Sequence, residues 1–212
     1  MKVIALVTQK GGSGKSTLCV SLAVAAQEAG HTVCILEMDR QATASQWAIA
    51  RKGVPPEVAP IAPDRIEVSL QRISSGEYDY VFIDTPGIDS PGTNAAIRHA
   101  DLCLIPCRPT PADLRGVAPT LGAVHRLEKP FAFVLNQAPP KGYRVRDTAE
   151  GLKVMGVLAD VNIVMRNDHQ DAMATGQGVT EFNPTGAAAT EIRGLWAWVD
   201  NRTKEHLNVE AA

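Results

Sequence analysis

The sequence predicts an α/β fold with a mostly parallel, doubly wound sheet and helices on both faces. Short apolar runs alternate with longer amphipathic segments almost from the first residue, which is the pattern of strand–helix–strand units. The runs are continuously apolar, as expected for strands buried on both faces. Several polar motifs follow directly after such runs. Because these sheets bind ligands at the carboxyl ends of their strands, the motifs are predicted to meet at one edge.

Five apolar runs are predicted strands, and a sixth candidate follows them. The strands are residues 3–7, 32–38, 80–83, 102–105 and 131–135, with the sixth candidate at 157–164. Predicted helices cover residues 16–29, 44–52, 66–73, 114–127 and 185–206, the fourth with a kink or a late start at Pro119. Residues 54–63 hold four prolines and are predicted to be a surface loop or an extended connector.

Length and composition predict one globular domain spanning residues 1–212. Apolar residues make up 45% of the chain and charged residues 21%, which excludes a disordered or a fibrous protein. The net charge of −2 excludes a nucleic-acid binder that is basic throughout, and leaves room for a local basic patch. No apolar stretch approaches the ~18 residues of a membrane span.

The four cysteines are predicted to be reduced core residues of a cytoplasmic protein, because each lies in an apolar run. They are Cys19, Cys34, Cys103 and Cys107. If Cys103 and Cys107 share a strand, they lie about 13 Å apart. That distance is too long for both thiolates to bind one zinc ion.

The strongest motif is KGGSGKST, between the first predicted strand and the first predicted helix. Glycines let the backbone wrap closely around phosphate oxygens, and the helix N-terminus adds favourable dipoles. In such a loop Lys15 reaches the β- and γ-phosphates, the Ser16 hydroxyl ligates Mg²⁺, and Thr17 bonds the α-phosphate. The first glycine of the usual pattern is replaced by Gln9. The candidate nucleotide-binding residues are Lys10, Gly11, Gly12, Ser13, Gly14, Lys15, Ser16 and Thr17.

This motif resembles the deviant Walker A loop of the ParA/MinD family of partition and positioning ATPases, which have the P-loop NTPase fold. The resemblance extends along nearly the whole chain. It is closest to the short, ParF-like ParA proteins, in which no DNA-reading domain precedes the loop. It implies an ATPase that uses ATP and Mg²⁺.

Two further segments resemble family motifs around the phosphates. LEMDRQATASQW is similar to the second motif, usually DxDPQ, with Asp39 at the second aspartate, Glu37 in place of the first and Arg40 in place of the proline. The resemblance places Asp39 near Mg²⁺ and the attacking water; as an alternative, Asp39 only caps the next helix. YDYVFIDTPG resembles the Walker B and switch II segment, which implies that Asp84 holds Mg²⁺.

Later segments resemble parts of the family that surround the base and the dimer interface. ADLCLIPCRPTPADL implies a loop near that interface, where Asp113 either makes a contact or caps a helix. FVLNQAP and the C-terminal segment make Asn136 and Pro184 candidates for contact with adenine. Formation of a turn is an alternative explanation for Asn136.

The second lysine of the loop has a distinct implied role. In the family this signature lysine crosses to the phosphates of the partner subunit, in a homodimer that encloses two ATP molecules. An added cation offsets charge that develops on the phosphates during transfer. The candidate catalytic residues are therefore Lys10, Lys15 and Asp39, and the candidate metal ligands are Ser16, Asp39 and Asp84.

The resemblance also implies partners. An ATP-bound dimer would bind DNA without sequence preference in the cytoplasm, on the nucleoid, and a ParB-like or cargo-adaptor protein would stimulate hydrolysis. Non-specific DNA binding needs several phosphate contacts. The candidates are Lys141, Arg144, Arg166 and Arg193, each of which could equally be a solvated surface charge.

Partition of plasmid or chromosome DNA is the leading interpretation. The same switch could instead position a protein cargo, such as a microcompartment. A MinD-like membrane switch needs an apolar, basic C-terminal helix, whereas residues 202–212 contain few bulky apolar side chains. An iron–sulfur electron carrier needs paired cysteines at strand ends, whereas Cys103 and Cys107 lie inside and just after a predicted strand. A metabolic kinase is a further alternative, but it would not need Lys10.

Overall fold

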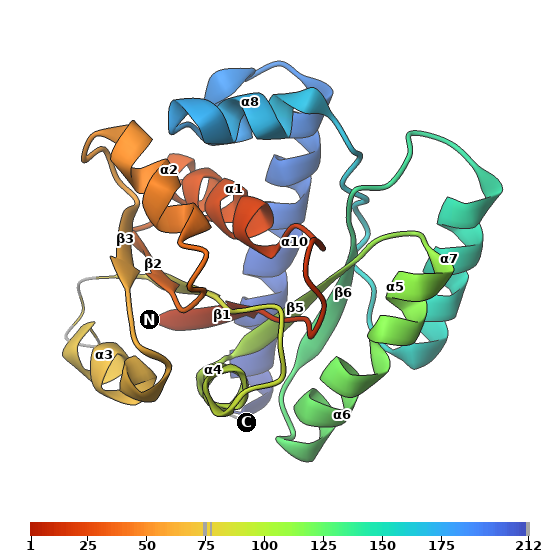
Figure 1. Cartoon of the computed structure of the whole chain (residues 1–212), viewed down its shortest axis with the longest axis horizontal. Helices are drawn as coiled ribbons and strands as arrows, with labels where there is room; N and C mark the ends of the chain where they lie inside the picture. The colour runs from red at the N-terminus through yellow and green to blue at the C-terminus, as the bar shows by residue number, and fades with distance from the viewer. Residues whose placement is uncertain (74–75, 77, 211–212) are drawn as a thin grey trace.

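A computed structural model of the chain describes residues 1–73, 76 and 78–210, without side chains from residue 205 onward. In this part of the chain six strands form one all-parallel sheet in the order β3-β2-β4-β1-β5-β6 (Figure 1). The strands are β1 (Lys2–Leu6), β2 (Val33–Glu37), β3 (Glu57–Pro60), β4 (Tyr80–Asp84), β5 (Leu102–Cys107) and β6 (Phe131–Leu135). The predicted parallel, doubly wound sheet is confirmed.

The strand order creates a switch point at β1. This strand lies between β4 and β5, with Leu6 in register with Asp84 on one side and Leu104 on the other. The chain leaves β1 towards β2 on one side, and later leaves β4 for β5 on the other. Connections that diverge in this way open a crevice at the carboxyl ends of the strands. The glycine-rich loop follows β1 directly and therefore lies at this crevice.

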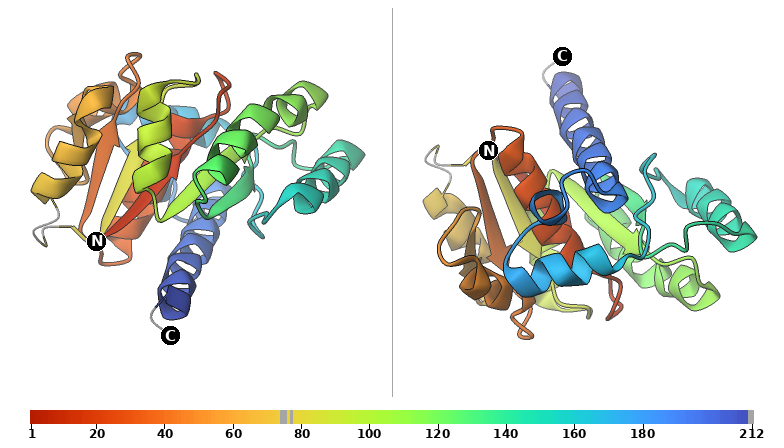
Figure 2. Two further views of the ribbon diagram at one scale, coloured as in Figure 1. Left: turned by 90° about the horizontal axis from the view of Figure 1, so that it is seen from below. Right: turned by 90° about the horizontal axis from the view of Figure 1, so that it is seen from above.

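Helices cover both faces of the sheet, as Figure 2 shows from two sides. Packed on one face are α1 (Lys15–Glu28), α2 (Thr43–Arg51), α8 (Asn167–Thr175), α9 (Val179–Phe182) and α10 (Ala187–Glu210). The other face carries η1 (Pro63–Arg65), α3 (Ile66–Ile73), α4 (Pro91–His99), α5 (Pro111–Gly116), α6 (Ala118–Arg126) and α7 (Tyr143–Met155).

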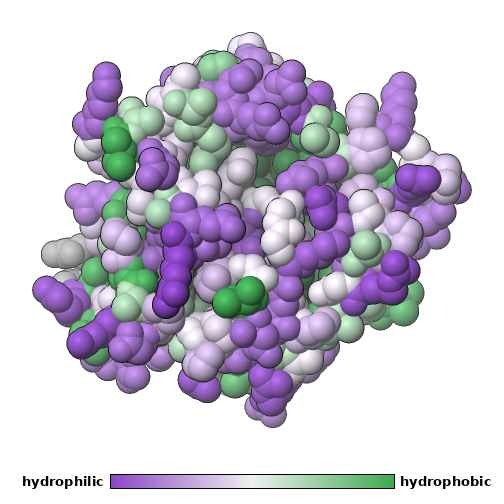
Figure 3. Space-filling model, viewed as in Figure 1, coloured by the Kyte–Doolittle hydropathy of each residue, from purple (hydrophilic) through white to green (hydrophobic). Residues whose placement is uncertain are grey.

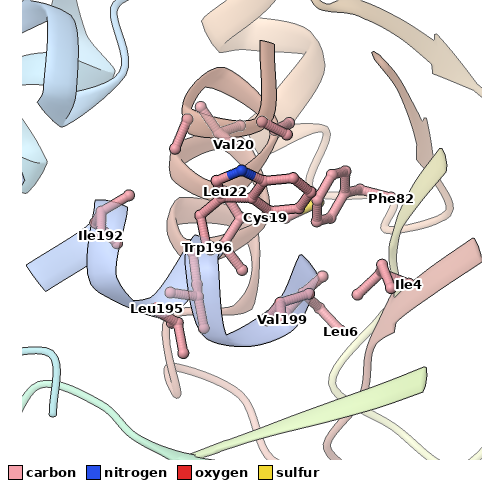
Figure 4. Close-up of a cluster of buried hydrophobic side chains, with 14 of the residues drawn as sticks. Ile4, Leu6, Cys19, Val20, Leu22, Phe82, Ile192, Leu195, Trp196 and Val199 are labelled. Carbon is pink, nitrogen blue, oxygen red and sulfur yellow. The ribbon is translucent and has the colours of Figure 1, made fainter. Parts of the chain in front are cut away.

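Two hydrophobic cores follow from the alternation of side chains along each strand. Ile4 and Leu6 face α1 and α10, whereas Val3 and Ala5 face the opposite layer. In the first core the Trp196 and Phe82 rings pack with centroids 6.2 Å apart, and Leu22 of α1 lies beside them (Figure 4). Burial of each such large side chain stabilises the fold by roughly 1.5–3 kcal/mol. The surface over the face drawn in Figure 3 is largely hydrophilic, with small separate hydrophobic patches.

Two expectations about the strands are wrong. The proline-rich connector contains β3, an edge strand that pairs with β2; proline is tolerated there because an edge strand needs fewer N–H donors. Residues 157–164 form no strand. They touch the sheet at two isolated bridges, Phe133 to Leu158 and Ala138 to Val164, because the chain bends at Asp160 between them.

The helix predicted at 114–127 is two helices, α5 and α6, that join at Val117. Pro119 has no N–H to donate and lies in the first turn of α6, so it marks the late start that the sequence allowed. The last helix begins at Ala187 and extends to Glu210. Helices α4, α7, α8 and α9 were not anticipated from periodicity.

All four cysteines are buried and free of disulfides, as predicted. Within the described residues, no helix is long and apolar enough to cross a membrane. The side chains of residues 205–210 and all of 211–212, on which the MinD-like alternative partly depends, lie outside the described part.

Candidate functional site

A cleft of about 1080 Å³ lies at the carboxyl edge of the sheet. Its walls are the glycine-rich loop, the end of β2, the segment from η1 to α3 and the turn after β4. Among the lining residues are Lys15, Ser16, Asp39, Pro63, Gly87 and Gly92. Residues far apart in sequence therefore meet at the edge where the sequence predicted a site.

The glycine-rich loop has a conformation that depends on its glycines. Gly12 and Gly14 have φ values of 75° and 86°, which side chains other than glycine rarely adopt. A Cβ on Gly14 would also lie 2.6 Å from Asn136 Nδ2. Gly87 of the turn after β4 packs so closely that a Cβ there would lie 3.0 Å from the Gly11 backbone nitrogen. The turn after β4 and the glycine-rich loop are thus in direct contact.

Two amide side chains support this loop from behind. Asn136 Nδ2 donates a hydrogen bond to the Ser13 carbonyl at 2.8 Å, and Gln137 Nε2 donates to the Gly12 carbonyl at 3.3 Å. Asn136 is 4% exposed. Its contact with the loop was missed by the sequence analysis, and its role in reading adenine stays a prediction. The polar residues at the end of β6 were the available signal.

Lys15, the first residue of α1, is buried although it carries a charge. Desolvation lowers the pKa of its ammonium group, and the nearby carboxylates of Asp84 and Asp39 act in the opposite direction. A buried cation at a helix N-terminus, beside backbone N–H groups, forms an environment that favours bound anions.

Asp84 ends β4 and is fully buried, and neither carboxylate oxygen has a hydrogen-bond partner among the described residues. Burial raises its pKa to about 7; the Ser16 hydroxyl, which is close but does not reach hydrogen-bonding geometry, and the Lys15 ammonium act in the opposite direction. An unpaired buried carboxylate costs stability. Such a group is expected where a ligand supplies the missing partner.

The oxygen donors around this carboxylate fit a magnesium ion. Ser16 and Asp39 line the cleft and both lie near enough to Asp84 to affect its pKa, and hydroxyl and carboxylate oxygens are ligands that Mg²⁺ prefers. No group of three or more His, Cys, Asp or Glu residues within the described ranges could hold a metal ion. Mg²⁺ does not require one, because it commonly binds one or two protein groups together with phosphate oxygens and water.

Asp39 lies in the loop after β2, where its Oδ1 accepts a hydrogen bond from the Gln41 backbone at 3.0 Å. Glu37, two residues earlier, accepts hydrogen bonds from the first turn of α2. No role for Glu37 was predicted from the sequence.

Lys10 forms an ion pair with Asp113 at 3.0 Å. Asp113 is 4% exposed and also accepts a hydrogen bond from Arg108 Nε at 3.1 Å and one from the Thr110 hydroxyl. Despite burial, these donors keep the pKa of Asp113 below its usual value. The alternative that Asp113 caps the helix is wrong, because Thr110 is the N-cap of α5.

A second, smaller pocket of about 130 Å³ lies on the other side of the glycine-rich loop. It is lined by Gly14, Thr17, Ser21, Asn136, Gln137, Met165, Arg166 and His169, among others. Among the residues that the structure describes, no group hydrogen-bonds to the buried Arg166 Nε or His169 Nε2, and burial lowers the pKa of His169. Pro184 does not line this pocket; it is exposed, and its carbonyl accepts a hydrogen bond from Arg193 at 2.6 Å.

The four basic candidates for DNA binding lie in different settings. Arg166 pairs with Glu191 at 2.7 Å, and Arg193 donates to the carbonyls of Pro184 and Thr180. Both therefore have structural contacts that the sequence did not indicate. Lys141 and Arg144 are exposed at the start of α7.

The cysteines are poorly suited to a metal cluster. Cys103 and Cys107 are buried in β5, and burial raises the pKa of their thiols to about 12 and about 11. Metal binding requires the thiolate.

Comparison with known proteins gives a consistent result. The model of the CobQ/CobB/MinD/ParA nucleotide binding domain matches residues 4–192. A curated relative, the maintenance of carboxysome distribution protein A of Gloeobacter kilaueensis, is 35% identical over 200 residues, which cover 90% of this chain and 89% of the relative.

Solved structures agree on the fold. Apo McdA from Cyanothece superposes with a TM-score of 0.78 at 16% identity, covering 94% of this chain and 99% of that one. A putative plasmid partition protein from Borrelia burgdorferi bound to AMPPNP gives 0.76 at 19% identity, covering 95% and 99%.

Proposed function

Because the chain belongs to the CobQ/CobB/MinD/ParA nucleotide-binding family, we propose that it is a ParA-type ATPase whose ATP-bound dimer binds DNA and dissociates after hydrolysis. One observation carries the proposal: the buried carboxylate of Asp84 has no partner in the described chain and lies near buried Lys15. Such a pair costs the free protein stability, and binding of a metal–phosphate ligand compensates for it.

In this proposal the loop binds the nucleotide with its backbone. N–H groups of residues 11–17 surround the phosphates, and Lys15 neutralises charge on the β- and γ-phosphates. Bound Mg²⁺, held by Ser16, Asp39 and Asp84, would neutralise charge that develops on the transferred phosphoryl group. Asp39 orients the attacking water from the wall of the cleft.

We place the adenine in the smaller pocket. Thr17 and Asn136 line this pocket, and Thr17 is the residue that would hydrogen-bond the α-phosphate. The unpartnered Nε of Arg166 and Nε2 of His169 supply polar groups for the base. Pro184 lies outside this pocket in the nucleotide-free chain, so its contact with adenine would require movement of the segment after α9.

Dimer formation depends on Lys10 in this mechanism. In the single chain Asp113 holds the ammonium group of Lys10. Asp113 retains Arg108 and Thr110 when Lys10 leaves, so the cost of release is small. Lys10 then contacts the phosphates of the ATP bound to the partner subunit.

The dimer binds the phosphates of DNA without regard to sequence. It acts in the cytoplasm, on the nucleoid, and does not use a membrane. Lys141 and Arg144 are the better candidates: within the described residues Arg144 contacts only the neighbouring exposed Tyr143, whereas Arg166 pairs with Glu191 and Arg193 binds two backbone carbonyls. Two subunits double the number of phosphate contacts, so ATP controls DNA affinity through avidity. A ParB-like or cargo-adaptor protein stimulates hydrolysis and releases the dimer.

The leading task is partition of plasmid or chromosome DNA. Positioning of a protein cargo is the second candidate, because a relative with 35% identity is a carboxysome distribution protein. The stimulating adaptor distinguishes the two: a partition adaptor binds a specific DNA site, whereas a cargo adaptor binds the protein assembly.

Nucleotide-dependent binding to DNA tests the proposal. The chain is titrated with two unrelated duplexes and with anionic liposomes, in ATP, in ADP and without nucleotide. We expect ATP-dependent binding to both duplexes alike, with affinity that falls steeply as salt rises. Equal affinity in every nucleotide state, or binding to liposomes alone, would overturn it.

Asp39→Ala tests the hydrolytic step. ATP affinity should change by less than about threefold, while kcat should fall by about 10²–10⁴, because water positioning acts on the transition state. Asp64→Ala, at another place in the same cleft, is the control. Parental turnover in Asp39→Ala would remove Asp39 from the mechanism.

A further inference from the structure

Glu37 is an unusual residue in the segment that carries Asp39. It ends β2, in register with Asp84 of β4, and its side chain is 2% exposed. The family motif has an aspartate at this position. A buried glutamate at this position must have partners that compensate for the burial of its carboxylate.

The carboxylate of Glu37 closes the loop between β2 and α2. Its Oε1 accepts a hydrogen bond from the Ala44 backbone at 2.7 Å, and its Oε2 accepts one from the Ser45 backbone at 3.0 Å and another from the Ser45 hydroxyl. These are N–H groups of the first turn of α2, which have no partner within the helix. The usual capping position is Ala42, which has no side chain able to accept them.

The other end of this loop is held by the sheet. The Met38 N–H donates to the Asp84 carbonyl at 2.9 Å, and the Ala42 N–H donates to the Asp39 carbonyl at 3.0 Å. Asp39 thus lies in a short closed segment, attached to β4 at one end and to α2 through Glu37 at the other.

Helix α2 is itself a firm support. Trp47 Nε1 donates to the Gln177 carbonyl at 3.0 Å, and Arg51 pairs with Glu181 at 2.7 Å. The loop therefore takes its position from elements that are packed on both sides of it.

We propose that Glu37 is a positioning residue for ATP hydrolysis: its carboxylate ties the loop of residues 38–43 to α2 and so fixes Asp39 at the wall of the phosphate cleft. This inference rests on the proposed role of Asp39. Glu37 does not touch the nucleotide, because both of its oxygens face the first turn of α2.

The test compares Glu37→Gln with Glu37→Asp in the full-length chain. Glu37→Gln keeps the size but replaces one acceptor with an NH₂ group that cannot accept from Ser45. We expect kcat for ATP hydrolysis to fall by about 10- to 100-fold, in the range found when a supporting residue around a catalytic group is lost. ATP affinity should change by less than about threefold. Glu37→Asp keeps the charge with a shorter reach, so its kcat should lie between the parent and Glu37→Gln.

A structural control separates positioning from general loss of stability. Val199→Ala shortens a fully buried side chain of α10 that has no part in holding α2 or the loop, and it should lower the thermal midpoint of unfolding without changing kcat. Hydrogen exchange of the Ala44 and Ser45 amides, measured without nucleotide, should accelerate in Glu37→Gln and stay at the parental rate in Val199→Ala.

The outcomes are distinguishable. If the unmutated chain does not hydrolyse ATP, the proposed function fails and the positioning role fails with it. If the unmutated chain hydrolyses ATP and Glu37→Gln does so at the parental rate, only the positioning role is overturned. An equal loss of kcat in Val199→Ala and Glu37→Gln would also overturn it, because the effect would then be one of stability.

Discussion

Two regions of the molecule bury charged side chains, but only one of them provides those side chains with hydrogen-bond partners among the described residues. Beneath α2, the Arg51 guanidinium donates to the carbonyls of Val54, Pro55 and Gly176 and makes a two-pronged contact with Glu181. Near Lys15 of the glycine-rich loop, Asp84 is buried more deeply still, and both of its oxygens lack a hydrogen-bond partner among the described residues.

The difference shows that burial of a charge is not by itself a sign of function. The Arg51–Glu181 pair connects α2 to α9, and its hydrogen-bonding groups are used within the chain. Breaking such a pair leaves a buried group unsatisfied, which is costly. The Asp84 carboxylate bears that cost already in the free protein, and it is the group for which a ligand is expected.

Arg51→Ala should have the largest effect on stability. The free energy of unfolding should fall by about 3–5 kcal/mol, because Glu181 and several carbonyls lose their partner. Desolvation raises the pKa of Glu181, but the hydrogen bonds from Arg51 outweigh it and the pKa is lowered. The contribution of this pair to the free energy of unfolding is therefore fully present above the pKa of Glu181 in the unfolded chain. It is lost as pH falls through the lower pKa of the folded chain. Urea denaturation of this variant and of Arg72→Ala, an exposed arginine on α3, measures the difference. A loss of free energy of unfolding below about 1 kcal/mol would contradict the claim that the buried Arg51–Glu181 pair stabilises the fold.

Lys15→Ala should have the next largest effect, this time on binding. ATP affinity should fall by about 10- to 100-fold, which corresponds to loss of charge-assisted hydrogen bonds of ~1.5–3 kcal/mol. Nucleotide titration by fluorescence measures the affinity, with Lys153→Ala on exposed α7 as the control. Unchanged affinity would contradict the role of the loop.

Asp84→Asn is expected to raise stability, in contrast to the loss expected for Arg51→Ala. The amide has nearly the same shape without the charge, so the nucleotide-free chain should gain about 1–3 kcal/mol of stability, while Mg²⁺-dependent hydrolysis should be lost. Asp113→Asn is the matched control: Asp113 is also buried but has Lys10, Arg108 and Thr110 as partners, so this change should destabilise the chain. If both variants moved stability in the same direction, the distinction between satisfied and unsatisfied burial would fail.

Lys10→Ala should have the smallest effect on the single chain. Lys10 is partly exposed and its partner Asp113 keeps two other donors, so stability should change by less than about 1 kcal/mol. ATP binding should persist through Lys15, while dimers in ATP should weaken by at least about tenfold. Sedimentation velocity in ATP and in ADP measures this. Dimers at the parental affinity would contradict the cross-subunit contact.

Much of the fold and of the phosphate site could be predicted from local sequence. Five strands and the loop of residues 10–17 were identified because continuous apolar runs and closely spaced glycines have few alternative structures. The edge strand β3 was missed, since its prolines are typical of a connector and its pairing with β2 depends on a neighbour distant in sequence. For the same reason the sequence could not show that residues 157–164 meet β6 at only two points.

The sequence by itself determined which residue types gather at the carboxyl edge of the sheet, because strand ends carry Asp39, Asp84 and Asn136 to that edge in any parallel arrangement. Only the tertiary structure decided which polar atoms there are used within the chain and which are left for a ligand. Asn136 and Glu37 form hydrogen bonds with the Ser13 carbonyl and with the first turn of α2, whereas the Asp84 carboxylate has no such partner in the part of the chain that the structure describes. The physical reason is that hydrogen bonds are short and directional. Whether a buried polar group is satisfied therefore depends on partners brought within about 3 Å by folding, and the order of residues along the chain does not contain that distance.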